Sequence, residues 1–267
     1  MSILQAIILG IVQGITEFLP VSSSGHLIFI PEIFGWQDQG ISFDVMVHMG
    51  TLVAVIIFFR KKIWELVTAL FSKNPIKKQD RRLAWLLIAS VIPAGVVGYI
   101  LDSNSRSAFI VGVSLIFWGI ILAVADRYSH HIAQKKELMS DLHTLSVKQI
   151  AFIACAQVLA LIPGTSRSGI TMTAGLFAKL NKKAAAEFSF LMGTPIIALA
   201  GGVKLLEMIQ SGTGRISLTA LTVGFIVSAL SGVAAIAILM KIIQKWSFLP
   251  FAVYRVLIGI LIILFLV

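Results

Sequence analysis

Six apolar runs of membrane-spanning length are the strongest constraint that this sequence places on its fold. They cover residues 41–59, 83–101, 108–125, 186–206, 217–240 and 248–267. A helix of about 20 apolar residues crosses a hydrocarbon core of about 30 Å. Of the 267 residues, 58% are hydrophobic and 13% are charged, which is more apolar side chain than one soluble core of this length would bury. The sequence therefore predicts an all-α polytopic membrane protein with six transmembrane crossings.

Two shorter apolar stretches end at breaks. Residues 3–19 run into Pro20 and Gly25, and residues 147–162 run into Pro163 and Gly164. Proline and glycine stop helices, and apolar character resumes after each break. We therefore expect two helical hairpins, over residues 3–33 and 147–180.

The positions of the basic residues predict the orientation of the chain. Eight basic residues lie between residues 60 and 82 and four between 126 and 148, whereas the turn at 102–107 between these segments has only Arg106. Because positively charged loops stay in the cytoplasm, the two segments rich in basic residues, 60–82 and 126–148, are predicted to be cytoplasmic. The formal charge of +10 then reflects these loops and an anionic lipid surface, and no nucleic acid partner is expected.

The same rule predicts that the second hairpin is re-entrant. It starts near Lys148 and ends near Lys179, Lys182 and Lys183, so a single crossing would put the second basic cluster outside. A hairpin that turns back at residues 163–169 keeps both ends inside. Counting back from the first basic loop makes the hairpin at 3–33 enter from the opposite face.

A weak internal similarity agrees with this topology. A shift of 144 positions aligns identical residues at 13 and 157, 22 and 166, 24 and 168, and 25 and 169, and a shift of 143 aligns 49–51 with 192–194. We predict one transmembrane domain, 1–267, with inverted repeat halves at about 1–125 and 147–267 joined by a cytoplasmic loop, 126–146. Inverted repeats of this kind place a binding site near the midplane, formed by broken helices.

Hydroxyl side chains and one arginine gather at the two breaks. Irregular backbone at membrane depth must pack in protein or line a wet cavity, so the two breaks are expected to meet. Hydroxyls, backbone amides at helix starts and an arginine fork together suit a phosphate group. The alternative is that the hydroxyls bond only to neighbouring backbone. The candidate residues of this anion site are Ser22, Ser23, Ser24, Thr165, Ser166, Arg167, Ser168 and Thr171.

Glu17 and Gln13 lie four residues apart before the first break, which places them on one helix face. Their oxygens could hold Mg²⁺ or Ca²⁺, completed by phosphate oxygens and water. The alternative is that Glu17 only neutralises Arg167, which is costly at depth without a partner.

Histidines near the first break have two interpretations each. His26 follows the break and suits a general base, a proton donor or a phosphoryl acceptor, or else a hydrogen-bonded packing role. His48 and Asp44 either face the cavity or form a polar pair at the outer face. The single cysteine, Cys155, excludes an intramolecular disulfide framework and a cysteine zinc cluster.

Three segments carry a resemblance that spans essentially the whole chain. Residues 13–26 resemble the (E/Q)xxxE segment and serine-histidine loop of the undecaprenyl pyrophosphate phosphatase family, also called the bacitracin resistance protein family. Residues 163–171 look like its PGxSRSxxT motif, and residues 248–255 are similar to its last helix. The resemblance implies a multi-pass enzyme of the bacterial inner membrane that removes the terminal phosphate of undecaprenyl pyrophosphate. The product, undecaprenyl phosphate, is the lipid carrier of cell-wall synthesis, and its recycling confers bacitracin resistance.

The resemblance also implies roles for single residues. It implies a Mg²⁺ or Ca²⁺ ion at Gln13 and Glu17, where Gln13 is the variant that leaves more of the binding to Glu17. Arg167 matches the phosphate-clamping arginine, supported by Ser166, Ser168 and Thr171. Ser23 matches the proposed nucleophile, while an older proposal places the catalytic role at the residue matching His26. The cavity is expected to open toward the periplasm.

A transporter or flippase for an anionic prenyl lipid is the competing function, because inverted repeats and re-entrant hairpins are common among transporters. Release of inorganic phosphate by detergent-solubilised protein would distinguish the two. The expected partners are the lipid substrate and membrane lipids, and the sequence leaves homo-oligomers open.

Overall fold

The computed structural model describes residues 1–100, 107–211 and 216–267, and helices make up most of them, with no β-strand in these ranges. The predicted turn at 102–107 with its Arg106 falls largely outside the described residues. The elements in chain order are α1 (Ile3–Thr16), α2 (Ser23–Ile33), α3 (Gly40–Phe58), α4 (Arg60–Leu70), η1 (Pro75–Lys77), α5 (Lys78–Ala89), α6 (Val91–Ile100), α7 (Ala108–Gln134), η2 (Leu142–Thr144), α8 (Val147–Val158), η3 (Leu159–Leu161), α9 (Arg167–Phe177), α10 (Lys182–Ser211), α11 (Leu218–Ile242) and α12 (Leu249–Leu266).

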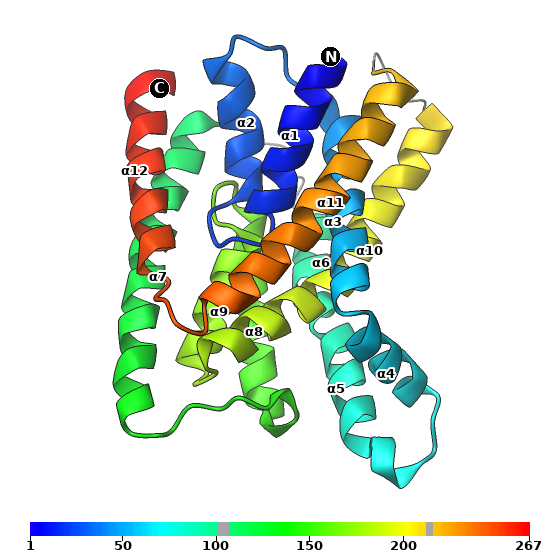
Figure 1. Ribbon diagram of the computed structural model, residues 1–267, viewed down its shortest axis with the longest axis vertical. Coiled ribbons are helices and arrows are strands. Elements are labelled where there is room, and N and C mark those ends of the chain that lie inside the picture. The colour runs from blue at the N-terminus through cyan, green and yellow to red at the C-terminus, as the bar shows by residue number, and fades with distance from the viewer. Residues whose placement is uncertain (101–106, 212–215) are drawn as a thin grey trace.

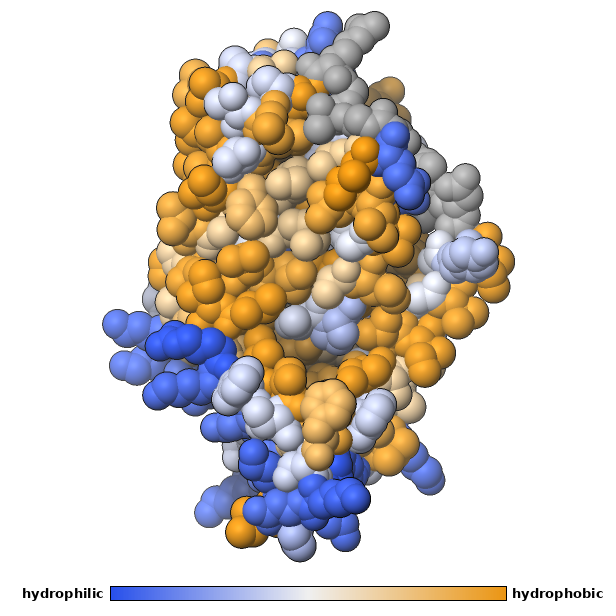
Figure 2. All heavy atoms as spheres, turned by 90° about the vertical axis from the view of Figure 1, so that its right-hand side faces the viewer, coloured by the Kyte–Doolittle hydropathy of each residue, from blue (hydrophilic) through white to orange (hydrophobic). Residues whose placement is uncertain are grey.

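Six of these helical segments are long and apolar enough to cross a membrane, which confirms the predicted all-α multi-pass fold. They are Gly40–Phe58, Pro75–Ile100, Ala108–Gln134, Lys182–Gln210, Leu218–Ile242 and Leu249–Leu266. The second of them is interrupted between α5 and α6 at Ser90, whose hydroxyl donates to the Leu87 carbonyl. Figure 2 shows one side of the molecule as a broad hydrophobic band with hydrophilic residues gathered toward the lower end.

The segments predicted to be cytoplasmic gather at one end of the molecule, and both chain termini lie at the other (Figure 1). Contacts join these segments directly. Arg82 donates to the Leu145 carbonyl over 2.7 Å, and Lys182 lies 3.3 Å from Asp126. Lys179 forms an ion pair with Glu137, which lowers the pKa of the Glu137 carboxyl. The grouping agrees with the predicted parity of the crossings.

The two hairpins approach from opposite ends. Figure 1 places α1 and α2 on the side of the termini and α8 and α9 nearer the basic end. Their first helices begin in the same way, since Ser2 and Gln5 form a capping box at α1, and Ser146 and Gln149 form one at α8. Both pairs are 144 positions apart, the shift found in the sequence. Re-entry into the bilayer and a repeat of the complete halves stay predictions.

Small residues let α1 and α3 pack closely against α11. A Cβ atom at Gly14 of α1 would overlap Ser231 of α11, and one at Gly50 of α3 would overlap Ser228 of the same helix. Such close helix contacts are how membrane helices associate without a hydrophobic driving force. This packing fixes the end of α1, where Glu17 lies.

Candidate active site

The two helix breaks have nearly the same local structure. Ser22 precedes α2 with φ 74° and ψ 96°, and Ser166 precedes α9 with φ 70° and ψ 110°. Positive φ is uncommon for a residue with a side chain and gathers at functional sites. In each break the serine hydroxyl also meets the hydroxyl two residues later, Ser24 at 3.3 Å and Ser168 at 3.4 Å. Two helix starts are thereby held in the same unusual geometry.

The two breaks contact each other, as the sequence predicted. The Ser168 hydroxyl donates to the Leu19 carbonyl over 3.2 Å. Arg255 of α12, which is fully buried, donates to carbonyls of both breaks: to Pro20 over 3.4 Å, Gly164 over 3.2 Å and Thr165 over 2.8 Å. Backbone oxygens that would be unsatisfied in lipid are thus partnered inside the protein.

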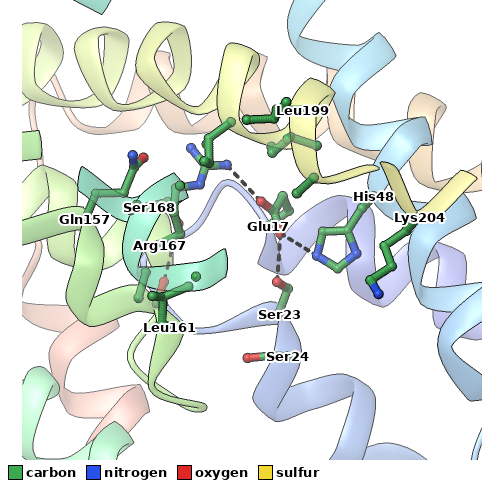
Figure 3. Close-up of a pocket in the computed structure, with 18 of the residues that line it drawn as sticks. Glu17, Ser23, Ser24, His48, Gln157, Leu161, Arg167, Ser168, Leu199 and Lys204 are labelled. Carbon is green, nitrogen blue, oxygen red and sulfur yellow. Dashed lines mark hydrogen bonds and ion pairs between the residues drawn. The ribbon is translucent and has the colours of Figure 1, made fainter. Parts of the chain in front are cut away.

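Glu17 is the meeting point of side chains from four parts of the chain. One carboxylate oxygen, Oε1, accepts from Arg167 Nη2 over 2.8 Å. The other, Oε2, accepts from Ser23 Oγ over 2.7 Å and from Gln13 Nε2 over 3.0 Å. His48 Nε2 lies 3.6 Å from the same oxygen. Figure 3 shows Arg167, Ser23 and His48 approaching Glu17 from three directions.

Arg167 is held in place by α10. Its Nη1 atom donates to the Ser189 carbonyl over 3.1 Å, and the Ser189 hydroxyl lies 2.7 Å from that of Thr171. The guanidinium passes over Gly193, where a Cβ atom would overlap it. The glycine therefore provides the space in which Arg167 reaches Glu17.

The two histidines near the first break differ in what their rings contact. His26 is buried with Nδ1 at 2.7 Å from the Ser22 carbonyl and Nε2 at 2.7 Å from the Tyr254 hydroxyl. His48 donates from Nδ1 to the Asp44 carbonyl over 2.7 Å, which leaves Nε2 without its proton in the neutral ring and directed at Glu17. The structure thus answers the question left open for His48, which faces the cavity.

A cavity of about 740 Å³ connects Glu17, Arg167 and His48 with the surface between α6 and α10. Its deep end holds Glu17, Arg167 and the serines of both breaks. Its outer walls are apolar, formed by residues such as Ala94, Gly98, Leu199 and Val203, with Lys204 and Glu207 at the rim. Figure 2 shows a hollow in the hydrophobic band with hydrophilic residues within it. The cavity therefore matches an amphiphile with an anionic head.

Most of the predicted site residues line this cavity: Glu17, Ser22, Ser23, Ser24, Ser166, Arg167 and Ser168. Gln13, His26, Thr165 and Thr171 are buried behind the lining. Ser189, Arg255 and Gln157 are site residues that the sequence does not predict. In the sequence Gln157 stands out only as an aligned position of the repeat, and Arg255 only as part of the resembling segment 248–255.

The donor set for a divalent cation is small. Among the described residues no group of three or more His, Cys, Asp and Glu side chains could hold a metal ion. Gln13 Oε1 is buried and has no hydrogen-bond partner in the described part of the chain, and it belongs to the amide that contacts Glu17. The nitrogen of this amide faces Glu17, and a half-turn of the amide would bring Oε1 there instead. An amide oxygen and a carboxylate together fit a hard cation that takes its other ligands from phosphate and water.

The fold and the cavity define a multi-pass helical membrane protein with serine, glutamate and arginine side chains at the bottom of an amphiphilic pocket. Residues 6–261 match the family model described as bacitracin resistance protein BacA, and the chain belongs to this family. It is 43% identical to undecaprenyl-diphosphatase 2 of Stutzerimonas stutzeri over 99% of both chains. It is 44% identical to undecaprenyl-diphosphatase of Hahella chejuensis, over 97% of this chain and 96% of the relative.

Proposed function

We propose that this chain is an undecaprenyl-diphosphate phosphatase, which hydrolyses undecaprenyl pyrophosphate to undecaprenyl phosphate and inorganic phosphate. The observation that carries the proposal is the Ser23, Glu17 and Arg167 cluster at the end of an apolar-walled cavity. The names of the relatives support the same reaction. They give no support to the transporter or flippase alternative.

The reaction begins with attack by Ser23. Its Oγ forms a bond to the terminal phosphorus while the bond from that phosphorus to the bridging oxygen breaks, and prenyl monophosphate leaves. The hydroxyl proton passes to Glu17 Oε2, its hydrogen-bond acceptor at 2.7 Å, which is a workable distance for general base catalysis. Water then cleaves the phosphoserine, releasing inorganic phosphate and returning the proton to Ser23. His48 Nε2, at 3.6 Å from the same oxygen, is placed to share the proton.

Arg167 and the helix starts stabilise the charge on the transferring group. Arg167 and the first residues of α2 and α9, namely Ser23, Ser24 and Ser168, line the deep end of the cavity. Preorganised donors in a site that excludes water are the main source of stabilisation in phosphoryl transfer. His26 then serves to hold the Ser22 carbonyl, through the contact described above.

A divalent cation, Mg²⁺ or Ca²⁺, would be held by Glu17 and the Gln13 amide oxygen. When bound it would neutralise phosphate charge and favour departure of the leaving group. In the structure Gln13 Nε2 donates to Glu17 over 3.0 Å, so Gln13 also orients the carboxylate.

The proposed location is the inner membrane, with the cavity open to the periplasm. Lys182, at the basic end, and Glu207, at the rim, are separated by about 37 Å along α10 at 1.5 Å per residue. The rim therefore lies toward the end opposite the basic segments, which supports the proposed orientation. The prenyl chain would lie along the apolar walls between α6 and α10 and continue into lipid.

The test is release of inorganic phosphate from a prenyl pyrophosphate by protein purified in detergent, with and without chelator. We expect release by the wild type and a loss of at least about 10³-fold in Glu17→Ala and Arg167→Ala. Exposed residues of the same types provide controls, so Glu32→Ala and Arg127→Ala should retain wild-type rates. Normal turnover in Glu17→Ala or Arg167→Ala would overturn the proposed site, and no release by the wild type would overturn the function.

A further inference from the structure

Gln157 is a buried polar side chain with no role in the mechanism above. It lies in the last turn of α8, is 2% exposed and lines the cavity together with Arg167 and Ser168. Figure 3 shows Gln157 and Arg167 on one side of Glu17, with His48 on the other. In this view the amide is on the Arg167 side of Glu17, opposite His48.

Both ends of the Gln157 amide lack a hydrogen-bond partner within the described residues: neither Nε2 nor Oε1 has one. Most buried polar groups in proteins are hydrogen-bonded, and an exception calls for an explanation such as a ligand. An amide that is unsatisfied at both ends and lines a cavity is best explained by a group that enters the cavity.

Two other glutamines show what is unusual about Gln157. Gln13 lies 144 positions earlier and donates to Glu17, four residues further on. The residue four after Gln157 is Leu161, whose side chain cannot accept a hydrogen bond. Gln149, on the same helix as Gln157, uses both ends of its amide, accepting from Ser146 N over 2.9 Å and donating to the Ala178 carbonyl over 2.8 Å.

We propose that Gln157 is a substrate-binding residue that recognises the diphosphate head of the lipid. Its Nε2 donates to a non-bridging phosphate oxygen beside Arg167, and its Oε1 accepts from a water molecule or from a protonated phosphate. This proposal rests on the proposed function and adds a neutral donor to the charged arginine. A neutral amide binds the head without a further buried charge, which would be costly at this depth.

The decisive variant is Gln157→Met, which keeps the length of the side chain and removes both polar ends. Two properties are measured: the KM and kcat for a prenyl pyrophosphate, and the Kd for its non-hydrolysable methylene bisphosphonate analogue. We expect KM and Kd to rise about tenfold with kcat within about threefold of wild type, as loss of one hydrogen bond to a charged group predicts. The melting temperature without ligand should stay the same or rise, because an unsatisfied polar group has been removed.

Gln149→Met is the matched control. It removes a glutamine whose partners are all within the protein, so it should lower the melting temperature and leave KM and Kd unchanged. Gln157→Glu keeps the shape and adds negative charge, and it should raise Kd more than Gln157→Met does.

Unchanged KM and Kd in both Gln157 variants would overturn the proposal. A lower melting temperature and lower kcat with unchanged Kd would overturn it in favour of a structural role. The analogue makes the outcome independent of turnover: if the wild type binds the analogue and releases no phosphate, the proposed function fails, while weaker binding in Gln157→Met still supports the binding role.

Discussion

The two helix breaks share a backbone and differ in chemistry. Ser22 and Ser166 adopt the same strained conformation, yet the residue that follows is Ser23 in the first break and Arg167 in the second. Five residues before these strained serines stand Glu17 and Leu161. The first break thus supplies the Ser23 hydroxyl and the Glu17 carboxylate, where the second supplies the Arg167 cation and an apolar side chain. The same backbone geometry therefore occurs twice: the first copy presents the nucleophile and its base, and the second presents the anion-binding cation.

The difference has an electrostatic reason. Each charged side chain at membrane depth costs about 2.5 to 3.5 kcal/mol on insertion scales unless it is paired. Two identical breaks would bring like charges together, whereas Glu17 and Arg167 pair across the breaks at 2.8 Å. The pair holds the breaks together before substrate arrives, and a phosphate group then provides a second anion for Arg167.

Ser23→Ala should have the largest effect on activity, because it removes the hydroxyl that the first break contributes to bond formation. We expect kcat to fall by at least about 10³-fold while the protein stays folded. Ser24→Ala, the adjacent hydroxyl in the same cavity, is the control and should lower kcat by less than about tenfold. Phosphate release under saturating substrate measures both, and equal losses in the two variants would argue against Ser23 as the nucleophile.

Gly193→Ala tests how α10 positions Arg167 of the second break. The added methyl overlaps the Arg167 guanidinium, and a displaced catalytic group costs up to about 10²-fold, so we expect kcat/KM to fall about 10- to 100-fold. Gly202→Ala, on the same helix with open space around it, should keep kcat/KM and raise the melting temperature slightly, since alanine favours a helix. A fall in kcat/KM in both variants would point to α10 in general instead of Arg167.

Lys204→Ala should have the smallest effect, because Lys204 lies at the rim outside both breaks. Its ammonium is 2.8 Å from Glu207 and about half exposed, so its charge is partly neutralised and screened. We expect KM at low salt to rise about threefold with kcat unchanged, and the difference from wild type to vanish at high salt. A large fall in kcat would mean that the rim takes part in chemistry.

Much of the fold could be predicted from the sequence because membrane insertion leaves a strong compositional signal. The six crossings follow from apolar length, and the hairpins follow from Pro20 and Pro163 with the serines around them. The shared end of the basic segments follows from charge. Each of these signals can be recognised within a short segment or from the order of segments along the chain.

The remaining site residues depend on contacts between helices that are far apart in the sequence, and no local sequence pattern indicates such contacts. Arg255 lies in an otherwise apolar last helix, and its partners are carbonyls 90 or more positions away. His48 lies 3.6 Å from Glu17 in a structure where Gly14 and Gly50 let α1 and α3 pack closely against α11. The repeat does contain a signal for Gln157, because this residue aligns with the predicted site residue Gln13.

In this account Ser23 of the first break attacks the terminal phosphorus, and Arg167 of the second break binds the diphosphate. The most direct test is the Kd of the methylene bisphosphonate analogue for Ser23→Ala and Arg167→Ala. We predict a Kd within about threefold of wild type for Ser23→Ala and one raised at least about tenfold for Arg167→Ala. Equal weakening of binding in both variants, or tighter binding by Arg167→Ala than by Ser23→Ala, would contradict the account.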